Sequence, residues 1–118
     1  MDYFPTFIKV KDKTVLVIGG TEDALHKVRL LRKSEAKIII FGAIVDKTLQ
    51  QWIDEGAVFH EPRAVQKADL AKAAFAYVGV DDAETRDHAI VLFEQFKLPY
   101  SVIDDKARSS FILSLIHI

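Results

Sequence analysis

A glycine-containing turn near the N-terminus has the residue types of a dinucleotide-binding loop. The apolar run 14–18 leads into residues 19–24, Gly-Gly-Thr-Glu-Asp-Ala, which we compare with the pattern G-x-G-x-x-G/A. Gly19 takes the place of the tight-turn glycine, and Ala24 that of the small residue that lets helix and strand pack closely. Thr21 stands where the pattern has the glycine that lets the backbone approach a pyrophosphate; its hydroxyl could cap the helix or contact a phosphate. A plain strand-to-helix turn is the alternative interpretation.

The end of the second expected strand, residues 36–41, lacks the side chains that commonly select the cofactor. Many NAD sites have an Asp or Glu there for the ribose hydroxyl, and NADP sites have an arginine nearby. Here Gly42 and Ala43 follow the strand, with neither an acid nor an arginine. An NAD site would therefore hold the ribose through backbone groups or through residues from elsewhere in the chain, and no pocket for a 2′-phosphate is expected.

Short apolar runs alternate with amphipathic stretches along the chain, which is the pattern of a parallel sheet wrapped by helices. Continuous apolar runs predict strands buried on both faces, whereas the spacing of Ala24, Val28 and Leu31 predicts a helix. The sequence therefore predicts an α/β fold, a Rossmann-like doubly wound parallel sheet in three α/β/α layers, with ligands beyond the carboxyl ends of the strands. The expected strands are 14–18, 36–41, 57–60, 75–80, 100–103 and a candidate sixth at 109–113; the expected helices are 21–34, 46–55, 82–96 and one or two turns within 67–73.

Composition excludes several classes of protein. The 118 residues are enough for one domain, and a hydrophobic content of 50% excludes a disordered chain. The net charge of −1 argues against a nucleic-acid partner, which needs a clustered basic surface. Without cysteine there is no disulfide and no thiolate ligand, and the histidines have no metal-ligand spacing, so no metal site is expected. The apolar runs are too short to span a bilayer and the N-terminus lacks signal-peptide features, so we expect no membrane association and a cytoplasmic location.

Six short motifs follow one another in the order and spacing of a known family. They are Tyr-Phe-Pro-Thr-Phe at 3–7, Lys-Thr-Val-Leu-Val-Ile-Gly-Gly at 13–20, Asp-Ala-Leu-His-Lys-Val-Arg-Leu-Leu at 23–31, Ala-Tyr-Val-Gly-Val-Asp-Asp at 76–82, Tyr-Ser-Val-Ile-Asp at 100–104 and Ser-Phe-Ile at 110–112. Together, over residues 2–112, they resemble the NAD-binding domain of siroheme synthase, the precorrin-2 dehydrogenase and sirohydrochlorin ferrochelatase family.

The resemblance implies an activity, a cofactor and a set of site residues. Members oxidise precorrin-2 to sirohydrochlorin with NAD⁺, and many then insert Fe²⁺, so a tetrapyrrole and Fe²⁺ are the implied substrates. The family assigns both steps to one aspartate, here Asp104, whose carboxylate can take a proton; a loop-capping aspartate is the alternative. The glycine loop and the resemblance together place the NAD contacts at Gly19, Gly20, Thr21, Glu22, Asp23, Ala43, Ile44, Val80 and Asp81.

The chain departs from the family pattern at several positions. The family has three glycines where this chain has two followed by Thr21, Ser101 replaces an asparagine, and Lys106 and Ser114 replace prolines. Two alternatives therefore stay open: a non-catalytic NAD(H)-sensing Rossmann domain, as in regulators of potassium transport, and a degenerate paralogue that keeps the fold without the cofactor. The sensing domains usually have an acid at the end of the second strand, which this chain lacks, and they offer no role for Asp104.

The C-terminal end of the chain has a separate interpretation. Family members continue with a dimerisation segment and a helical region that helps to enclose the tetrapyrrole, so we expect a homodimer at full length. Residues 113–118, Leu-Ser-Leu-Ile-His-Ile, equal one reading frame of a transposon-end adapter used in sequencing libraries. We therefore expect an NAD-binding Rossmann domain at 1–112 and a non-native or truncated tail at 113–118.

Overall fold

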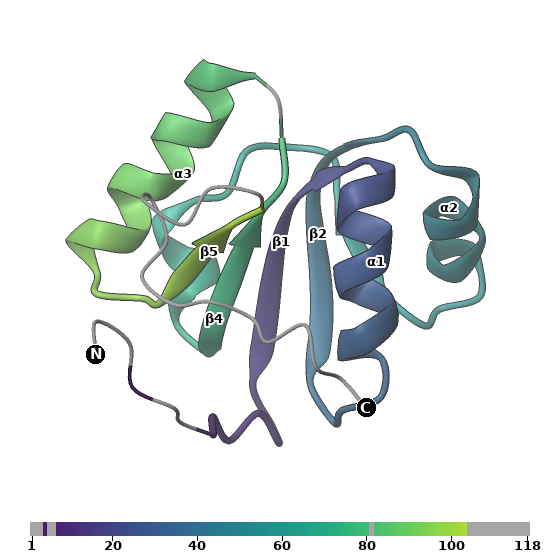
Figure 1. Cartoon of the computed structure of the whole chain (residues 1–118), viewed down its shortest axis with the longest axis horizontal. Helices are drawn as coiled ribbons and strands as arrows, with labels where there is room; N and C mark the ends of the chain where they lie inside the picture. The colour runs from purple at the N-terminus through teal and green to yellow at the C-terminus, as the bar shows by residue number, and fades with distance from the viewer. Residues whose placement is uncertain (1–3, 5–6, 81, 104–118) are drawn as a thin grey trace.

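A five-stranded parallel sheet forms the centre of the molecule (Figure 1). The computed structural model describes residues 4, 7–80 and 82–103. The strand order is β3-β2-β1-β4-β5, and every neighbouring pair is parallel. The elements are, in chain order, β1 (Thr14–Gly20), α1 (Glu22–Leu31), β2 (Lys37–Ile44), α2 (Lys47–Asp54), β3 (Phe59–Glu61), the 3₁₀ helix η1 (Lys67–Leu70), β4 (Ala73–Val78), α3 (Ala83–Gln95) and β5 (Tyr100–Val102).

The chain winds outward twice from the middle of the sheet. It begins at β1, adds β2 and β3 on one side, and then returns through η1 to place β4 and β5 on the other side. The winding direction therefore reverses between β1 and β4, and this is the point where doubly wound sheets bind their ligands. The prediction of a Rossmann-like doubly wound sheet is confirmed.

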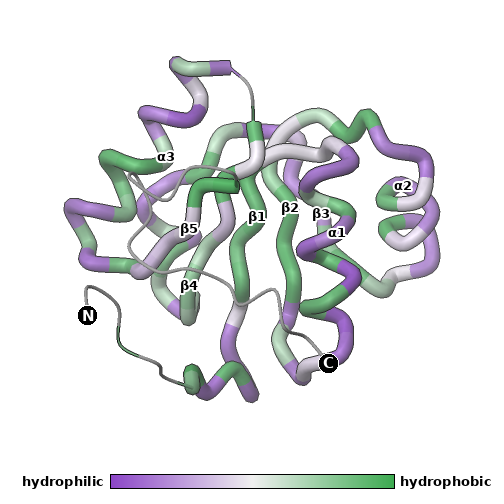
Figure 2. Tube along the Cα trace, viewed as in Figure 1, coloured by the Kyte–Doolittle hydropathy of each residue, from purple (hydrophilic) through white to green (hydrophobic). Residues whose placement is uncertain are grey.

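The sheet is the middle of three layers. Val15 and Val17 of β1 are fully buried in the core that includes α1, whereas Leu16 and Ile18 belong to the core that includes α3, because successive strand residues point to opposite faces. Helices α1 and α2 thus cover one face and α3 covers the other (Figure 1). Figure 2 shows the consequence, since β1 and β2 are largely hydrophobic along their length and the helices alternate between hydrophobic and hydrophilic residues.

The prediction that the second strand stops at Gly42 is wrong. β2 continues through this residue to Ile44. Gly42 has a φ of 103°, which glycine adopts at little cost, and the register with β1 shifts at this point, because Ile18 pairs with Phe41 whereas Gly20 pairs with Ile44. The glycine therefore carries an irregularity within the strand and does not end it.

The remaining strand and helix boundaries differ from expectation by a few residues. The candidate sixth strand at 109–113 and the tail at 113–118 lie outside the described residues. In the described part of the chain, no helix combines the length and the apolar character needed to cross a membrane.

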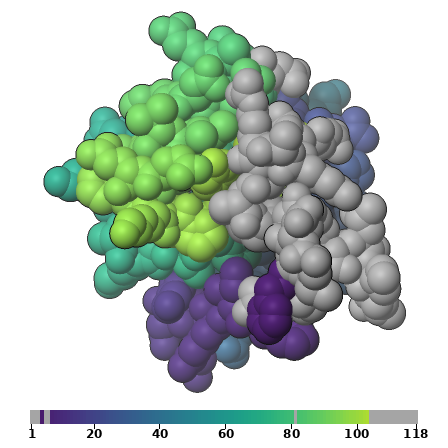
Figure 3. Space-filling model, turned by 60° about the vertical axis from the view of Figure 1, so that its left-hand side comes forward, coloured from purple at the N-terminus to yellow at the C-terminus, as the bar shows by residue number. Residues whose placement is uncertain are grey.

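The carboxyl ends of the strands share one edge of the sheet, at the top of Figure 1. The N-terminal segment 7–13 lies at the opposite edge, below the start of β1. In Figure 3, α3 and β5 form the surface of one side in green and yellow, and the N-terminal segment lies at the bottom in purple. The side on which the fold binds ligands is therefore remote from the N-terminal segment.

Candidate functional site

Gly19 and Gly20 allow three strand ends to meet at the switch point. Gly19 has a φ of 111°, and a Cβ on this residue would lie 2.7 Å from the carbonyl oxygen of Gly79, just after β4. A Cβ on Gly20 would lie 2.5 Å from the carbonyl oxygen of Ala43 in β2. Neither position has room for a side chain, so the packing of strand ends alone demands both glycines. The turn brings together five of the predicted residues: Gly19, Gly20, Ala43, Ile44 and Val80.

Thr21 begins α1 without capping it. Its backbone is extended, with φ −94° and ψ 179°, a conformation that does not require glycine. Its hydroxyl is directed at the carbonyl oxygen of Gly79, 3.4 Å away, and makes no capping hydrogen bond to the helix. The first N–H groups of an α-helix have no intrahelical acceptor. Those of α1 are therefore available to an external anion, and the capping role considered for the hydroxyl is not observed.

Two exposed carboxylates, Glu22 and Asp23, lie in the first turn of α1. In this place they stabilise the helix through its dipole. They also oppose a diphosphate by like-charge repulsion, although exposure to solvent and salt screens this effect. The turn can therefore bind an anion through its backbone N–H groups, while its side chains offer acceptors for hydroxyl groups.

A cavity of about 240 Å³ opens at the same edge, on the α3 side of the sheet. It is bounded by the ends of β1 and β2, the loop after β3 and the first turns of α3, with Phe41, Gly42, Arg63, Val65, Thr85 and His88 among its walls. His88 Nε2 lies 3.1 Å from the carbonyl oxygen of Val65, which ties α3 to the loop. Pockets for whole small molecules usually measure roughly 300–1,000 Å³, so this cavity suits one part of a dinucleotide, such as its base.

A larger hollow of about 670 Å³ lies at the other edge of the sheet, between η1 and the end of α3. Alanine, leucine and proline side chains make up much of its wall, with Phe96, Lys67 and Lys97 at its margin. It adjoins the starts of β4 and β5, whereas doubly wound sheets bind ligands at the carboxyl ends of their strands. Its size therefore does not make it the functional site.

The residues at the carboxyl edge fit a dinucleotide. The uncapped turn of α1 matches a diphosphate, because helix N-termini bind anions through N–H groups and the helix dipole. A Cβ on Gly42 would meet no atom within 4 Å, so the backbone of β2 is open to a ligand beside the cavity. Gly19, Gly20 and Thr21 would hold the diphosphate, and the cavity would take the adenosine end.

Two of the predicted site residues, Asp81 and Asp104, lie outside the described residues. The residues next to them in the sequence, Asp82 and Ile103, are described. Asp82 caps α3: its carboxylate accepts one hydrogen bond from the hydroxyl of Thr85 and another, of 2.9 Å, from the N–H of Thr85. These two bonds, the one from the hydroxyl first, hold the pKa of the Asp82 carboxyl below its usual range. The N–H of Ile103 donates to the carbonyl oxygen of Val78 at 2.8 Å. The residue before Asp104 is thus at the carboxyl end of β4, beside the switch point.

Three polar residues at or just after the end of β3 were not predicted as site residues from the sequence: His60, Glu61 and Arg63. His60 Nε2 lies 2.6 Å from the carbonyl oxygen of Gly42, and Glu61 is in register with Phe41 of β2. Arg63 lines the cavity. A doubly wound sheet places its third strand beside its second. The expected strand order could therefore have indicated that residues following the third strand lie near the second. In the described part of the chain, no group of three or more His, Asp or Glu side chains could hold a metal ion.

Comparison with known proteins agrees with this geometry. Residues 6–115 match the family model described as "Putative NAD(P)-binding". The structure resembles that of SirC, a precorrin-2 dehydrogenase, with a TM-score of 0.66 and 21% sequence identity, over 74% of this chain and 44% of that one. This likeness supports the fold, and the family description supports NAD as the predicted cofactor.

Similar sequences include several siroheme synthases. The siroheme synthase of Thioalkalivibrio sulfidiphilus is 32% identical over 112 residues, which is 95% of this chain and 23% of the relative. That of Pseudoalteromonas atlantica is 36% identical over 84 residues, 71% of this chain and 18% of the relative. The chain thus spans about a quarter of the length of these relatives or less. It belongs to the NAD(P)-binding family whose model it matches, and the resemblance to the NAD-binding domain of siroheme synthases is confirmed.

Proposed function

We propose that this domain binds NAD⁺ for the oxidation of precorrin-2 to sirohydrochlorin in siroheme biosynthesis. One observation carries the proposal: the two glycines and the uncapped start of α1 meet at the switch point of the sheet, in a chain whose relatives are siroheme synthases. The fold and the family support a cofactor site, and the names of the relatives supply the substrate.

The reaction removes two hydrogens from the tetrapyrrole, one as a hydride and one as a proton, and leaves a new double bond. NAD⁺, when bound, supplies the hydride acceptor. The part of this chain is to hold the diphosphate at the N-terminus of α1 and to accept the proton. We assign the proton to the carboxylate of Asp104, because it directly follows Ile103, which is hydrogen bonded at the end of β4.

The same carboxylate would serve a second reaction. Insertion of Fe²⁺ into sirohydrochlorin releases two pyrrole protons, and a base beside the cleft can take one. We therefore include iron insertion in the proposal for the full-length protein, with the tetrapyrrole and Fe²⁺ as substrates. We also propose that the full-length protein is a homodimer and that it is located in the cytoplasm.

Cofactor binding is tested by calorimetry with NADH and NAD⁺ on this chain, with Thr21→Gly beside it. The expected result is a Kd for the parent below about 1 mM, because backbone N–H groups hold the diphosphate whatever the side chain at Thr21. Binding only by Thr21→Gly would mean that the fold persists and the site has decayed, as in a degenerate paralogue. Absence of binding by both would contradict the proposal.

The role of Asp104 is tested in the full-length protein with Asp104→Asn. Loss of a general base should lower precorrin-2 oxidation by about 10²–10⁴-fold while NADH affinity stays unchanged. Asp105→Asn is the matched control, because it removes the same charge one residue along the chain. Equal activity of the two variants would contradict the assignment, and a parallel assay of Fe²⁺ insertion tells whether both reactions share the residue.

A further inference from the structure

Arg63 brings a guanidinium group to Phe41 of β2, beside the stretch where the sequence showed neither an acid nor an arginine. Its Cζ lies 5.5 Å from the centroid of the Phe41 ring, and both residues line the cavity beside Gly42. In doubly wound folds the end of the second strand faces the 2′-position of the adenosine ribose, and an arginine nearby accommodates the 2′-phosphate of NADP. The position of Arg63 alone would therefore favour NADP.

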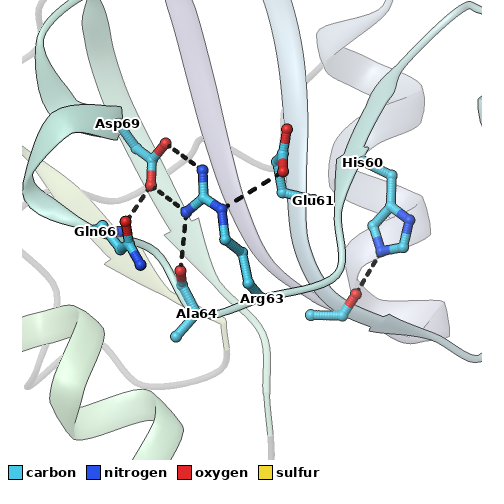
Figure 4. A network of polar contacts seen from close by, with 7 residues as sticks. His60, Glu61, Arg63, Ala64, Gln66 and Asp69 are labelled. Atoms are coloured by element: carbon cyan, nitrogen blue, oxygen red, sulfur yellow. Dashed lines mark hydrogen bonds and ion pairs between the residues drawn. The ribbon is translucent and has the colours of Figure 1, made fainter.

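Three of the five N–H groups of Arg63 donate hydrogen bonds, and its Nε faces Glu61, as Figure 4 shows. Two of its N–H groups bind the two carboxylate oxygens of Asp69, at 2.8 and 2.9 Å, in a bidentate pair. A third contact of 3.5 Å joins its Nε to Glu61, and Nη1 also donates to the carbonyl oxygen of Ala64 at 3.1 Å. The pair with Asp69 thus takes the Nη1–Nη2 edge, one of the planar edges through which an arginine binds a phosphate bidentately.

A backbone contact and burial hold the side chain of Asp69 in position beside Arg63. It accepts a hydrogen bond of 2.7 Å from the backbone N–H of Gln66 at the start of η1, and its side chain is only 15% exposed. The hydrogen bond with Arg63 holds the pKa of Asp69 below its usual value, so the carboxylate stays charged at neutral pH. The ion pair is thus fixed by the fold of the loop after β3.

We propose that the cluster Glu61–Arg63–Asp69 makes this site select NAD over NADP. The inference rests on the proposed function, which places a dinucleotide at this edge of the sheet. One guanidinium and two carboxylates leave the cluster with a net negative charge, so it repels a 2′-phosphate. Glu61, in register with Phe41 of β2, offers the ribose hydroxyls the carboxylate that β2 itself lacks.

The proposal is tested by calorimetric titration of this chain with NADH and NADPH, at about 50 mM salt so that charge effects are little screened. Asp69→Asn keeps an acceptor for the N–H of Gln66 and frees one edge of Arg63. We expect the affinity for NADPH relative to NADH to rise about tenfold in this variant. Glu61→Gln should raise the same ratio about threefold, because Glu61 contacts Arg63 at a longer distance and is more exposed.

Two controls separate this effect from a general change in charge. Asp54→Asn, at the end of α2, removes one exposed carboxylate that is not part of the cavity and should leave the ratio unchanged. Adding Arg63→Ala to Asp69→Asn should abolish the gain, because the freed guanidinium is then absent. A rise that survives this second substitution would overturn the proposal.

The remaining outcomes distinguish this inference from the proposed function. If the parent prefers NADH and the ratio stays within about twofold in both Asp69→Asn and Glu61→Gln, a change too small for a freed charged contact, the selection by this cluster is refuted while the cofactor site stands. A parent that binds NADPH as well as NADH refutes the selection in the same way. A parent that binds neither dinucleotide overturns both the proposed function and this inference.

Discussion

The three α-helices of the described chain begin in two different ways. Asp46 accepts a hydrogen bond of 3.0 Å from the N–H of Leu49 in α2, and Asp82 accepts one of 2.9 Å from the N–H of Thr85 in α3. At α1 the corresponding residue, Thr21, turns its hydroxyl to β4 and leaves the helix without a side-chain cap. A side chain thus caps the first turn of α2 and of α3, whereas no side chain caps the first turn of α1.

The uncapped helix is the one that follows the central strand of the sheet. α1 follows the central strand β1, and its first turn lies at the switch point next to Gly79. α2 follows β2, on the side of β1 opposite to β4, and the N–H of its cap residue Asp46 donates to the carbonyl oxygen of Gly20 at 3.0 Å. α3 follows β4, and its first turn lines the cavity. A cap at α1 would compete with a diphosphate for the same N–H groups, whereas a cap at α2 only adds stability. We therefore assign the diphosphate to the open turn of α1, whereas the caps of α2 and α3 stabilise their helices.

Among the substitutions that test this difference between the helices, Gly19→Ala should lower the free energy of unfolding the most. A Cβ there combines an unfavourable φ with a 2.7 Å approach to the carbonyl oxygen of Gly79, so we expect a loss of about 3 kcal/mol in the free energy of unfolding. Gly42→Ala is the matched control, because its φ is also positive but no atom lies within 4 Å of the added Cβ. Gly42→Ala should lower the free energy of unfolding by about 1–2 kcal/mol. Equal losses in denaturant titrations would mean that the close approach at the switch point does not constrain the turn.

The next effect should come from Asp46→Ala. This change removes the cap of α2, and we expect a loss of about 1 kcal/mol in the free energy of unfolding. NADH affinity should stay unchanged, because no residue of α2 lines the cavity and the substitution keeps the backbone N–H of Asp46 that donates to Gly20. Denaturant titration and calorimetry measure the two quantities. A loss of NADH binding without a loss of stability would reverse the roles that we assign to α1 and α2.

The layered fold was predictable because its signals are local. The continuous apolar run at 14–18 belongs to a strand buried on both faces, and the spacing of Ala24, Val28 and Leu31 matches the buried face of α1. The glycine turn was predictable because Gly19 and Gly20 match a known pattern between a strand and a helix, although the carbonyl oxygens that exclude a side chain there belong to Gly79 and Ala43, at other strand ends.

Features that depend on neighbouring strands were not predictable. Gly42 suggests a strand end by itself, and only the pairing of Gly20 with Ile44 shows that β2 continues beyond it. Arg63 lies more than 20 residues after the end of the expected second strand, and only the crossover after β3 brings it to Phe41. The direction of the Thr21 hydroxyl likewise depends on Gly79, which is 58 residues away in the sequence.

A smaller effect concerns pH and the cap of α3. Hydrogen bonds from Thr85 hold the pKa of Asp82 below its usual value of 3.8. Because the folded-state pKa is lowered, the stabilisation by Asp82 is fully present above about pH 4 and disappears as the pH falls through the folded-state pKa. The difference in unfolding free energy between the parent and Asp82→Asn should therefore be constant between about pH 5 and 7 and narrow below about pH 4. A difference that is the same at pH 3 and pH 7 would show that the charge of Asp82 contributes nothing to the cap.

The smallest effect on stability should come from Thr21→Ala, at the uncapped helix. The Thr21 hydroxyl makes no hydrogen bond to α1 and a long one of 3.4 Å to Gly79, so the free energy of unfolding should change by no more than about 0.5 kcal/mol. Removing a threonine that does cap a helix costs about 1 kcal/mol or more, so a loss of that size would mean that Thr21 caps α1 in solution. NADH affinity should also persist, because the diphosphate is held by backbone N–H groups that the substitution leaves in place. If neither the free energy of unfolding nor the NADH affinity changes, the Thr21 side chain contributes to neither, and the first turn of α1 binds its ligand without it.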